Sequence, residues 1–251
     1  MLVIRSLLVI GTVLAAGCHG PALVPPNTLT SPYDVARGEV LWAVVPLSNE
    51  SGTSILDPAS VSDAVVRACQ QIEGIRCLPL NRVIAEMRGL NMAAVRSPSE
   101  AAVLAERLGV NVLIVGTITD YDPYDPPRLG FSLVLETAGN LTSPDSADFG
   151  LDALRGSVGE DSSSPRARVR YEQLPSASAS VVLDGRNHAT LMELRRFAEG
   201  RHDPSSARGW EGYLASMPLY TEFAAHAAVS RLLDLERLRL ARAGAARVSA
   251  R

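Results

Sequence analysis

Lysine is absent from this chain of 251 residues, so all 24 of its basic side chains are arginines. Without lysine the chain has neither the phosphate-binding lysine of a P-loop nor an amine for a Schiff base, which excludes both of these enzyme classes. Its net charge of −3 also lacks the positive excess that binding to nucleic acid requires. We therefore expect no nucleic-acid partner.

The motifs of common catalytic and metal sites are missing as well. The chain contains no G-x-S-x-G, no H-E-x-x-H, no paired C-x-x-C and no G-x-G-x-x-G. Its four histidines lie without the neighbours that those motifs require: His19, His188, His202 and His226. We therefore expect no catalytic residues, no cofactor and no bound metal, and predict that the protein is not an enzyme. An envelope enzyme with an unfamiliar set of residues is the alternative.

Residues 1–17 have the features of a signal peptide, with one basic residue, Arg5, and an apolar run too short to span a bilayer. They end in LAAG before Cys18, which resembles a bacterial lipobox. Small residues suit the signal peptidase, and we expect the Cys18 sulfur to carry diacylglycerol, with further acylation such as palmitate, as the membrane anchor. The alternative is an ordinary secretory signal in which Cys18 has no role.

The residue after Cys18 bears on which membrane holds the anchor. It is His19, and not the aspartate that retains lipoproteins at the inner membrane of enterobacteria. We therefore expect the periplasmic face of the outer membrane, with the inner membrane as the alternative. Residues 18–38 are rich in proline, serine and threonine without an apolar period, which predicts a flexible tether between lipid and domain.

Residues 39–137 alternate apolar strands with amphipathic helices. Strands are predicted over 40–47, 74–80, 110–119 and 131–137, and helices over 58–73, 82–88 and 98–108. Asp57-Pro58 and Ser97-Pro98 favour helix starts, and Gly109 a helix end. The order β-α-β-α-α-β-β predicts an α/β fold with helices packed on a small mixed sheet. Its helix-linked strands are parallel, and its last two strands form an antiparallel hairpin.

Residues 120–130, which begin with DYDPYDPP, join the two strands of the predicted hairpin. Their carboxylates, from Asp120, Asp122 and Asp125, have the oxygen chemistry of a calcium site, but the glycine and closing glutamate of a calcium loop are missing. Asp and Pro together favour a turn. Aromatic residues beside carboxylates also suit protein contact, so Tyr121, Asp122, Tyr124 and Asp125 are the candidate partner-contact residues.

Once Cys18 is lipidated, two cysteines remain. Cys69 lies on the apolar stripe of its predicted helix, and Cys77 lies in the next predicted strand. An even number of cysteines in an oxidising compartment is compatible with a disulfide between them. Free cysteines also pack as small apolar residues, so two buried thiols are the equal alternative.

The rest of the chain changes character twice. Residues 138–180 are dense in Ser, Pro, Gly and Asp and predict a polar, flexible insertion. Residues 181–251 predict a strand and helices that pack on the α/β domain. The last helix mixes arginine and leucine with Asp234 and Glu236, which favours docking on the sheet or on a partner subunit over lying on anionic lipid.

Two stretches of the predicted domain resemble a known group of bacterial envelope proteins. VVPLSNESG resembles the Val-x-Pro-Phe-x-Asn-x-Ser-Gly entry strand of that group, and AERLGVNVLIVGTI resembles its helix–strand signature. The group comprises CsgG-like curli-secretion lipoproteins, LpoB-like activators of peptidoglycan synthases and the amino-terminal domain of TolB. The resemblance covers about 100 residues, over 40–137, and it implies the same α/β fold and no catalytic residues.

The resemblance implies two non-enzymatic functions. The first, which we favour, is a periplasm-facing lipoprotein that acts as an assembly, scaffold or activator module by binding another envelope protein. The second is a subunit of a self-oligomeric, CsgG-like secretion pore. Pore strands need about nine to eleven residues of alternating polarity, and residues 138–180 show no such alternation.

Overall fold

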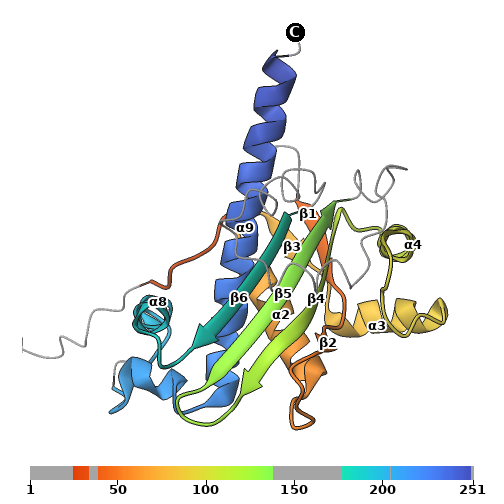
Figure 1. Cartoon of the computed structure of the whole chain (residues 1–251). Helices are drawn as coiled ribbons and strands as arrows, with labels where there is room; N and C mark the ends of the chain where they lie inside the picture. Colours follow the sequence, from red (N-terminus) through yellow and green to blue (C-terminus); the bar gives the residue numbers. More distant parts are fainter. Residues whose placement is uncertain (1–24, 34–38, 138–176, 204, 250–251) are drawn as a thin grey trace, which may run out of the picture.

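The computed structural model describes residues 25–33, 39–137, 177–203 and 205–249. A six-stranded mixed sheet lies between two layers of helices, and a long C-terminal helix extends past one end of the sheet (Figure 1). The predicted signal peptide, Cys18 and most of the predicted insertion over 138–180 lie outside the described residues.

The sheet has the strand order β3-β1-β4-β5-β6, with β2 also paired to β4. The strands are β1 (Val40–Val44), β2 (Ser48–Asn49), β3 (Ile75–Cys77), β4 (Val112–Asp122), β5 (Arg128–Thr137) and β6 (Ala177–Asp184). The helix-linked strands β3, β1 and β4 are parallel, whereas β4, β5 and β6 are antiparallel. The predicted fold class and its hairpin are thus confirmed.

The helices begin close to where their capping residues predict. They are α2 (Pro58–Gln70), α3 (Leu80–Gly89), α4 (Pro98–Leu108), α8 (His188–Ala198) and α9 (Met217–Ser249), with a 3₁₀ turn, η2 (Gly209–Tyr213). The Asp57 carboxylate accepts from the Ala59 N–H at 3.1 Å, and the Ser97 hydroxyl accepts from the Glu100 N–H at 3.2 Å. Gly109 ends α4 with a φ of 65°, which is left-handed backbone suited to glycine.

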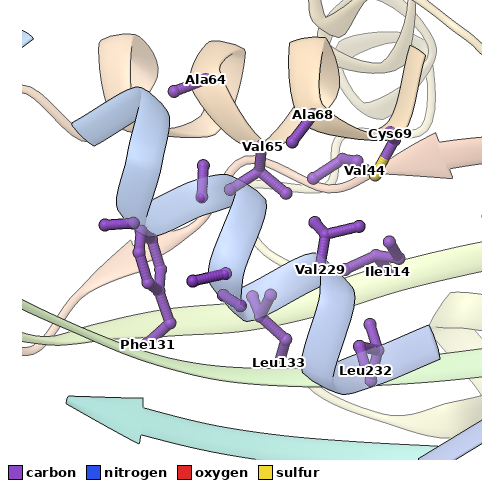
Figure 2. Close-up of a cluster of buried hydrophobic side chains, with 14 of the residues drawn as sticks. Val44, Ala64, Val65, Ala68, Cys69, Ile114, Phe131, Leu133, Val229 and Leu232 are labelled. Carbon is purple, nitrogen blue, oxygen red and sulfur yellow. The ribbon is translucent and has the colours of Figure 1, made fainter. Parts of the chain in front are cut away.

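Each face of the sheet has its own core. Val44, Ile114 and Leu133 point from the sheet toward α2 and α9, where they meet Val65 and Val229 (Figure 2). Side chains from α8 and η2 join this larger core. The smaller core, on the opposite face, lies between β1, β4 and the helix pair α3 and α4. The C-terminal helices therefore complete the core of the α/β domain.

Two segments of strand lie outside the strands that the sequence predicts. Residues 177–180 of the predicted flexible insertion form the start of β6, because Ala177 and Ala179 face the core while Ser178 and Ser180 alternate with them. Similarly, Ser48–Asn49, which follow the predicted strand over 40–47, form β2 and extend the pairing to β4. These segments are short and polar, so pairing with a neighbouring strand, not local composition, determines their conformation.

Part of the predicted tether is attached to the domain. Residues 27–33, called the strap below, run beside α9 and form a parallel bridge between Thr30 and Glu73. Leu29 and Tyr33 pack against the larger core. The prediction of a flexible tether over 18–38 is therefore wrong for the strap. The sequence pattern missed it because two apolar residues, Leu29 and Tyr33, are too few to establish a helix or strand period.

A histidine lies in the aromatic cluster that joins α8, η2 and α9. The rings of His226 and Phe197 are 4.8 Å apart. Burial, together with the positive charge of Arg201, lowers the pKa of His226 from 6.5 to about 4. The folded protein therefore keeps His226 neutral at pH values where the unfolded chain would protonate it.

This pKa difference predicts acid sensitivity between pH 6.5 and pH 4. In that range the unfolded chain binds the proton and the folded chain does not, so the free energy of unfolding falls as the pH is lowered. The fall between pH 7 and pH 5 is about 1–2 kcal/mol. Urea titrations at both pH values measure it, and His226→Gln should abolish it. An equal fall in parent and variant would contradict the assignment.

Candidate functional site

The four candidate contact residues lie together at the tip of the β4–β5 hairpin. Tyr121 and Asp122 end β4, while Tyr124 and Asp125 lie in the turn that follows. Asp122 is opposite Arg128 in the ladder, and its carboxylate accepts from the Tyr124 N–H at 3.1 Å. This carboxylate thus closes the turn, as the sequence predicts for an aspartate in this place.

A β-bulge determines which way the tip residues face. The ladder pairs Ile118 with Phe131 and then Asp120 with Gly130, so Thr119 is an extra residue in β4. Because side chains alternate along a strand, one extra residue exchanges the two faces beyond it. Tyr121 consequently shares the core side with its partner Leu129, and the carboxylates of β4 take the opposite side.

Glycine is required opposite the bulge. A Cβ atom on Gly130 would lie 2.6 Å from the Thr119 hydroxyl and 2.9 Å from the Asp120 Cβ. These separations are shorter than van der Waals contact allows, and the Asp120 backbone is held in the ladder. The glycine therefore lets the hairpin carry the bulge that positions Tyr121.

On the side of the hairpin away from the core, the guanidinium of Arg128 neutralises part of the negative charge of the tip. The Arg128 Nε lies 3.0 Å from the Asp120 carboxylate. Both groups are partly exposed, so the ion pair stabilises the fold by less than about 1 kcal/mol. It does orient the two strands at the tip. Within the described part of the chain, no cluster of three or more His, Cys, Asp or Glu side chains has the arrangement of a metal site.

The two tyrosines of the tip differ in exposure. Tyr121 packs against the larger core, and burial raises the pKa of its hydroxyl. Tyr124 is 75% exposed, the largest value among the large hydrophobic side chains that the structure describes. Of the four candidates, Tyr121 therefore supports the hairpin, and Tyr124, Asp122 and Asp125 present the accessible surface.

Ile55 belongs to the same end of the sheet, although the sequence analysis missed it. It is 62% exposed and lies in the loop after β2. Because β2 and β4 are parallel neighbours, the loops that follow them emerge at one end of the sheet (Figure 1). Hydrogen bonds of the Asn49 side chain with Thr53 O (2.7 Å) and Ser51 N (3.1 Å) shape this loop. In the sequence, the only indication of this exposed residue was an isolated isoleucine in a polar loop.

Cys69 and Cys77 are buried and in contact. Both are free thiols in the structure. A hydrogen bond to Cys77, followed by burial, raises the pKa of the Cys69 thiol well above its usual range. They therefore line the core between α2 and β3 as thiols, and their oxidation to a disulfide stays a prediction.

The polar residues of α9 hold the strap, a role that the sequence analysis missed. Arg237 bonds Asp234 at 2.8 Å and the Thr30 carbonyl at 2.7 Å. Glu236, which is fully buried, accepts from Arg239 and from the Tyr33 hydroxyl.

No described helix has both the length and the apolar character needed to cross a membrane.

Comparisons with known proteins find only distant structural likenesses. No protein-family model matches it, and no curated protein matches it. Solved structures that resemble it in part include the PelC dodecamer of Paraburkholderia phytofirmans, with 11% identity, a TM-score of 0.37 and coverage of 84% of this chain and 94% of that chain. Lipoprotein GNA1162 of Neisseria meningitidis has 19% identity, a TM-score of 0.32 and coverage of 57% and 79%.

The hypothetical protein CT253 of Chlamydia trachomatis is a third such structure, with 10% identity, a TM-score of 0.37 and coverage of 78% and 98%. One of these three structures is named as a lipoprotein. Identities and TM-scores this low establish neither family nor function.

Replacement of Gly130 tests the geometry of the hairpin. Gly130→Ala should lower the free energy of unfolding by about 1–3 kcal/mol, because the new methyl group displaces Thr119 and Asp120 in the ladder. Gly212→Ala, where a Cβ meets its nearest atom at 3.9 Å, is the matched control. Chemical denaturation measures both variants. Equal free energies of unfolding for the two variants would show that the bulge is absent or that it accommodates the methyl group without cost.

Proposed function

We propose that the protein is a non-enzymatic lipoprotein, anchored through Cys18 at the periplasmic face of the outer membrane, whose domain binds another envelope protein. One observation carries the protein-binding part. Tyr124 and Ile55, the two most exposed large hydrophobic side chains among the described residues, belong to loops at one end of the sheet. We call Ile55, Asp122, Tyr124 and Asp125 the contact surface.

The contact surface has the properties of a binding site for a protein. Tyrosine and isoleucine contribute apolar area on contact, and carboxylates beside them form a polar rim. Asp122 and the Asp120–Arg128 pair fix the hairpin, and Asn49 fixes the neighbouring loop. Because both loops are shaped before binding, little conformational entropy is lost when a partner docks.

Two further features support the proposal. The lipobox-like sequence before Cys18 suits a lipid anchor. The motifs over 40–137 resemble a group whose activator-type members, the LpoB-like activators of peptidoglycan synthases, act by binding another envelope protein. A role as an assembly, scaffold or activator module follows from both features together.

Self-association is the second candidate, as for a subunit of an oligomeric secretion pore. The observation that favours it is the projecting end of α9. Among the residues of α9 whose burial is described, up to 242, none after Glu236 is buried, and Leu238 is 54% exposed, while the helix itself continues to Ser249 (Figure 1). The exposed part of the helix after Glu236 offers a surface to a second copy of the chain.

Site-specific photo-crosslinking in the native envelope tests the proposal. Benzoylphenylalanine replaces Tyr124 in one variant, Ile55 in a second and Val103 in a control. Val103 is 46% exposed on α4, against the opposite core. We expect positions 124 and 55 to crosslink to the same envelope protein and position 103 to give no adduct with it.

Mass spectrometry of the adducts separates the outcomes. Adducts between copies of this chain at 124 and 55 would replace the proposal by self-association. Equal adducts at all three positions, or none at 124 and 55, would refute the contact surface. Tyr124→Ala combined with Ile55→Ala should abolish the complex and leave the melting temperature unchanged, since both side chains are largely exposed.

A further inference from the structure

The strap limits how far the domain can move from the proposed lipid anchor. Its bonds to the domain join Arg201 to Asn27 O at 2.7 Å, Arg237 to Thr30 O at 2.7 Å, Ser31 N to Glu73 O at 2.9 Å and Tyr33 to Glu236 at 3.1 Å. The first of these bonds holds Asn27 against Arg201, which lies three residues after the end of α8. The domain therefore holds the chain from Asn27 onward.

Asn27 is nine residues after Cys18 in the sequence. Fully extended, nine residues span about 30 Å. The 33-residue helix α9 alone is about 50 Å long. The linker is thus shorter than the domain, so the domain cannot turn freely above the bilayer. With the lipid on Cys18, Asn27 lies within about 30 Å of the membrane, so the surface around it is the part of the domain that the anchor keeps nearest.

That surface is formed by α8 and the loop after it. The strap leaves the domain beside α8 (Figure 1). Leu194 and Phe197 of α8 face the core, whereas Met192, Arg195 and Arg196 are exposed, Met192 by 40%. On a helix, residues three and four positions apart are neighbours, so both arginines lie one turn beyond Met192 on the same side of α8. An apolar side chain and two guanidinium groups therefore share the outward face of α8.

The charge of this region differs in sign from that of the whole chain. Residues 186–208 contain five arginines against three acidic residues: Arg186, Arg195, Arg196, Arg201 and Arg208 against Glu193, Glu199 and Asp203. Its formal charge is thus +2, whereas the chain carries −3. Arginine suits phosphate oxygens because its guanidinium donates two parallel hydrogen bonds. Met192 suits the boundary between headgroups and acyl chains.

We propose that the exposed face of α8, with Met192, Arg195 and Arg196, contacts anionic phospholipid headgroups of the bilayer that holds the Cys18 lipid. The inference rests on the proposed lipid anchor. Two arginines and one methionine bind a membrane weakly on their own, but the short linker keeps them at a high effective concentration beside it. The contact therefore orients a domain that the lipid already retains.

Photo-crosslinking to lipid tests this orientation. The mature chain is coupled through the Cys18 thiol to a maleimide phospholipid in phosphatidylethanolamine vesicles that contain phosphatidylglycerol. Cys69 and Cys77 are buried, so coupling is directed to Cys18. Benzoylphenylalanine replaces Met192 in one variant and Val103 in the control, which have similar exposures of 40% and 46%. We expect severalfold more phospholipid adduct at 192 than at 103.

A pair of charge variants tests the chemistry of the contact. Arg195→Gln with Arg196→Gln should lower the adduct at 192 severalfold. Arg82→Gln with Arg88→Gln, both exposed on α3, should leave it unchanged. Vesicles without phosphatidylglycerol should give the same loss as the first pair. Equal adducts at 192 and 103, or an adduct at 192 with a second copy of the chain, would overturn the inference.

The coupling also separates this inference from the proposed function. The lipid is attached chemically, so the vesicle result does not depend on lipidation in the cell. Release of Cys18→Ser protein from the native membrane tests the anchor by itself. If the parent protein is also released, the proposed lipid anchor is refuted. The proposed contact of α8 with lipid is still tested by the adduct at position 192.

Discussion

The structure depends on one buried charge, the carboxylate of Glu236 on α9. A fully buried carboxylate costs several kcal/mol unless donors replace its water. Here Arg239 donates twice, at 2.6 and 2.7 Å, and the Tyr33 hydroxyl donates at 3.1 Å. Burial and this carboxylate together raise the pKa of Tyr33, so its hydroxyl remains a donor at neutral pH. The strap is therefore part of the fold, because without it Glu236 would lose the Tyr33 donor and would be less buried.

This interaction connects the parts of the molecule that carry the proposed function. The ring of Tyr33 lies edge-on to that of Trp42, 6.3 Å away, so the strap also contacts the central sheet. Arg201 fixes the strap beside α8, and the hairpin tip lies next to the start of α8 because Gly185 N–H donates to Pro127 O at 2.9 Å. The contact surface and the proposed membrane-facing helix are thus held by one continuous body.

Features that depend on local sequence were predictable, and features that depend on distant contacts were not. Apolar periods and the caps at Asp57 and Ser97 are local, and they predict the fold class and the hairpin correctly. The bulge at Thr119 is not visible in composition, so Tyr121 was expected at the surface although it packs on the core. Likewise, Tyr33 and Glu236 are separated by 203 positions, and only the folded chain brings them together.

Native-state hydrogen exchange of the mature chain tests the central claim, that the strap belongs to the folded domain. The informative amides are those of Ser31 and Glu73, which bond Glu73 O and Leu29 O across the strap, with the buried Leu232 of α9 as the reference. We expect the amides of Ser31 and Glu73 to be protected, and Tyr33→Phe to reduce their protection more than that of Leu232. Exchange of both at the rate of an unfolded peptide, with Leu232 protected, would show a free tether and contradict the account.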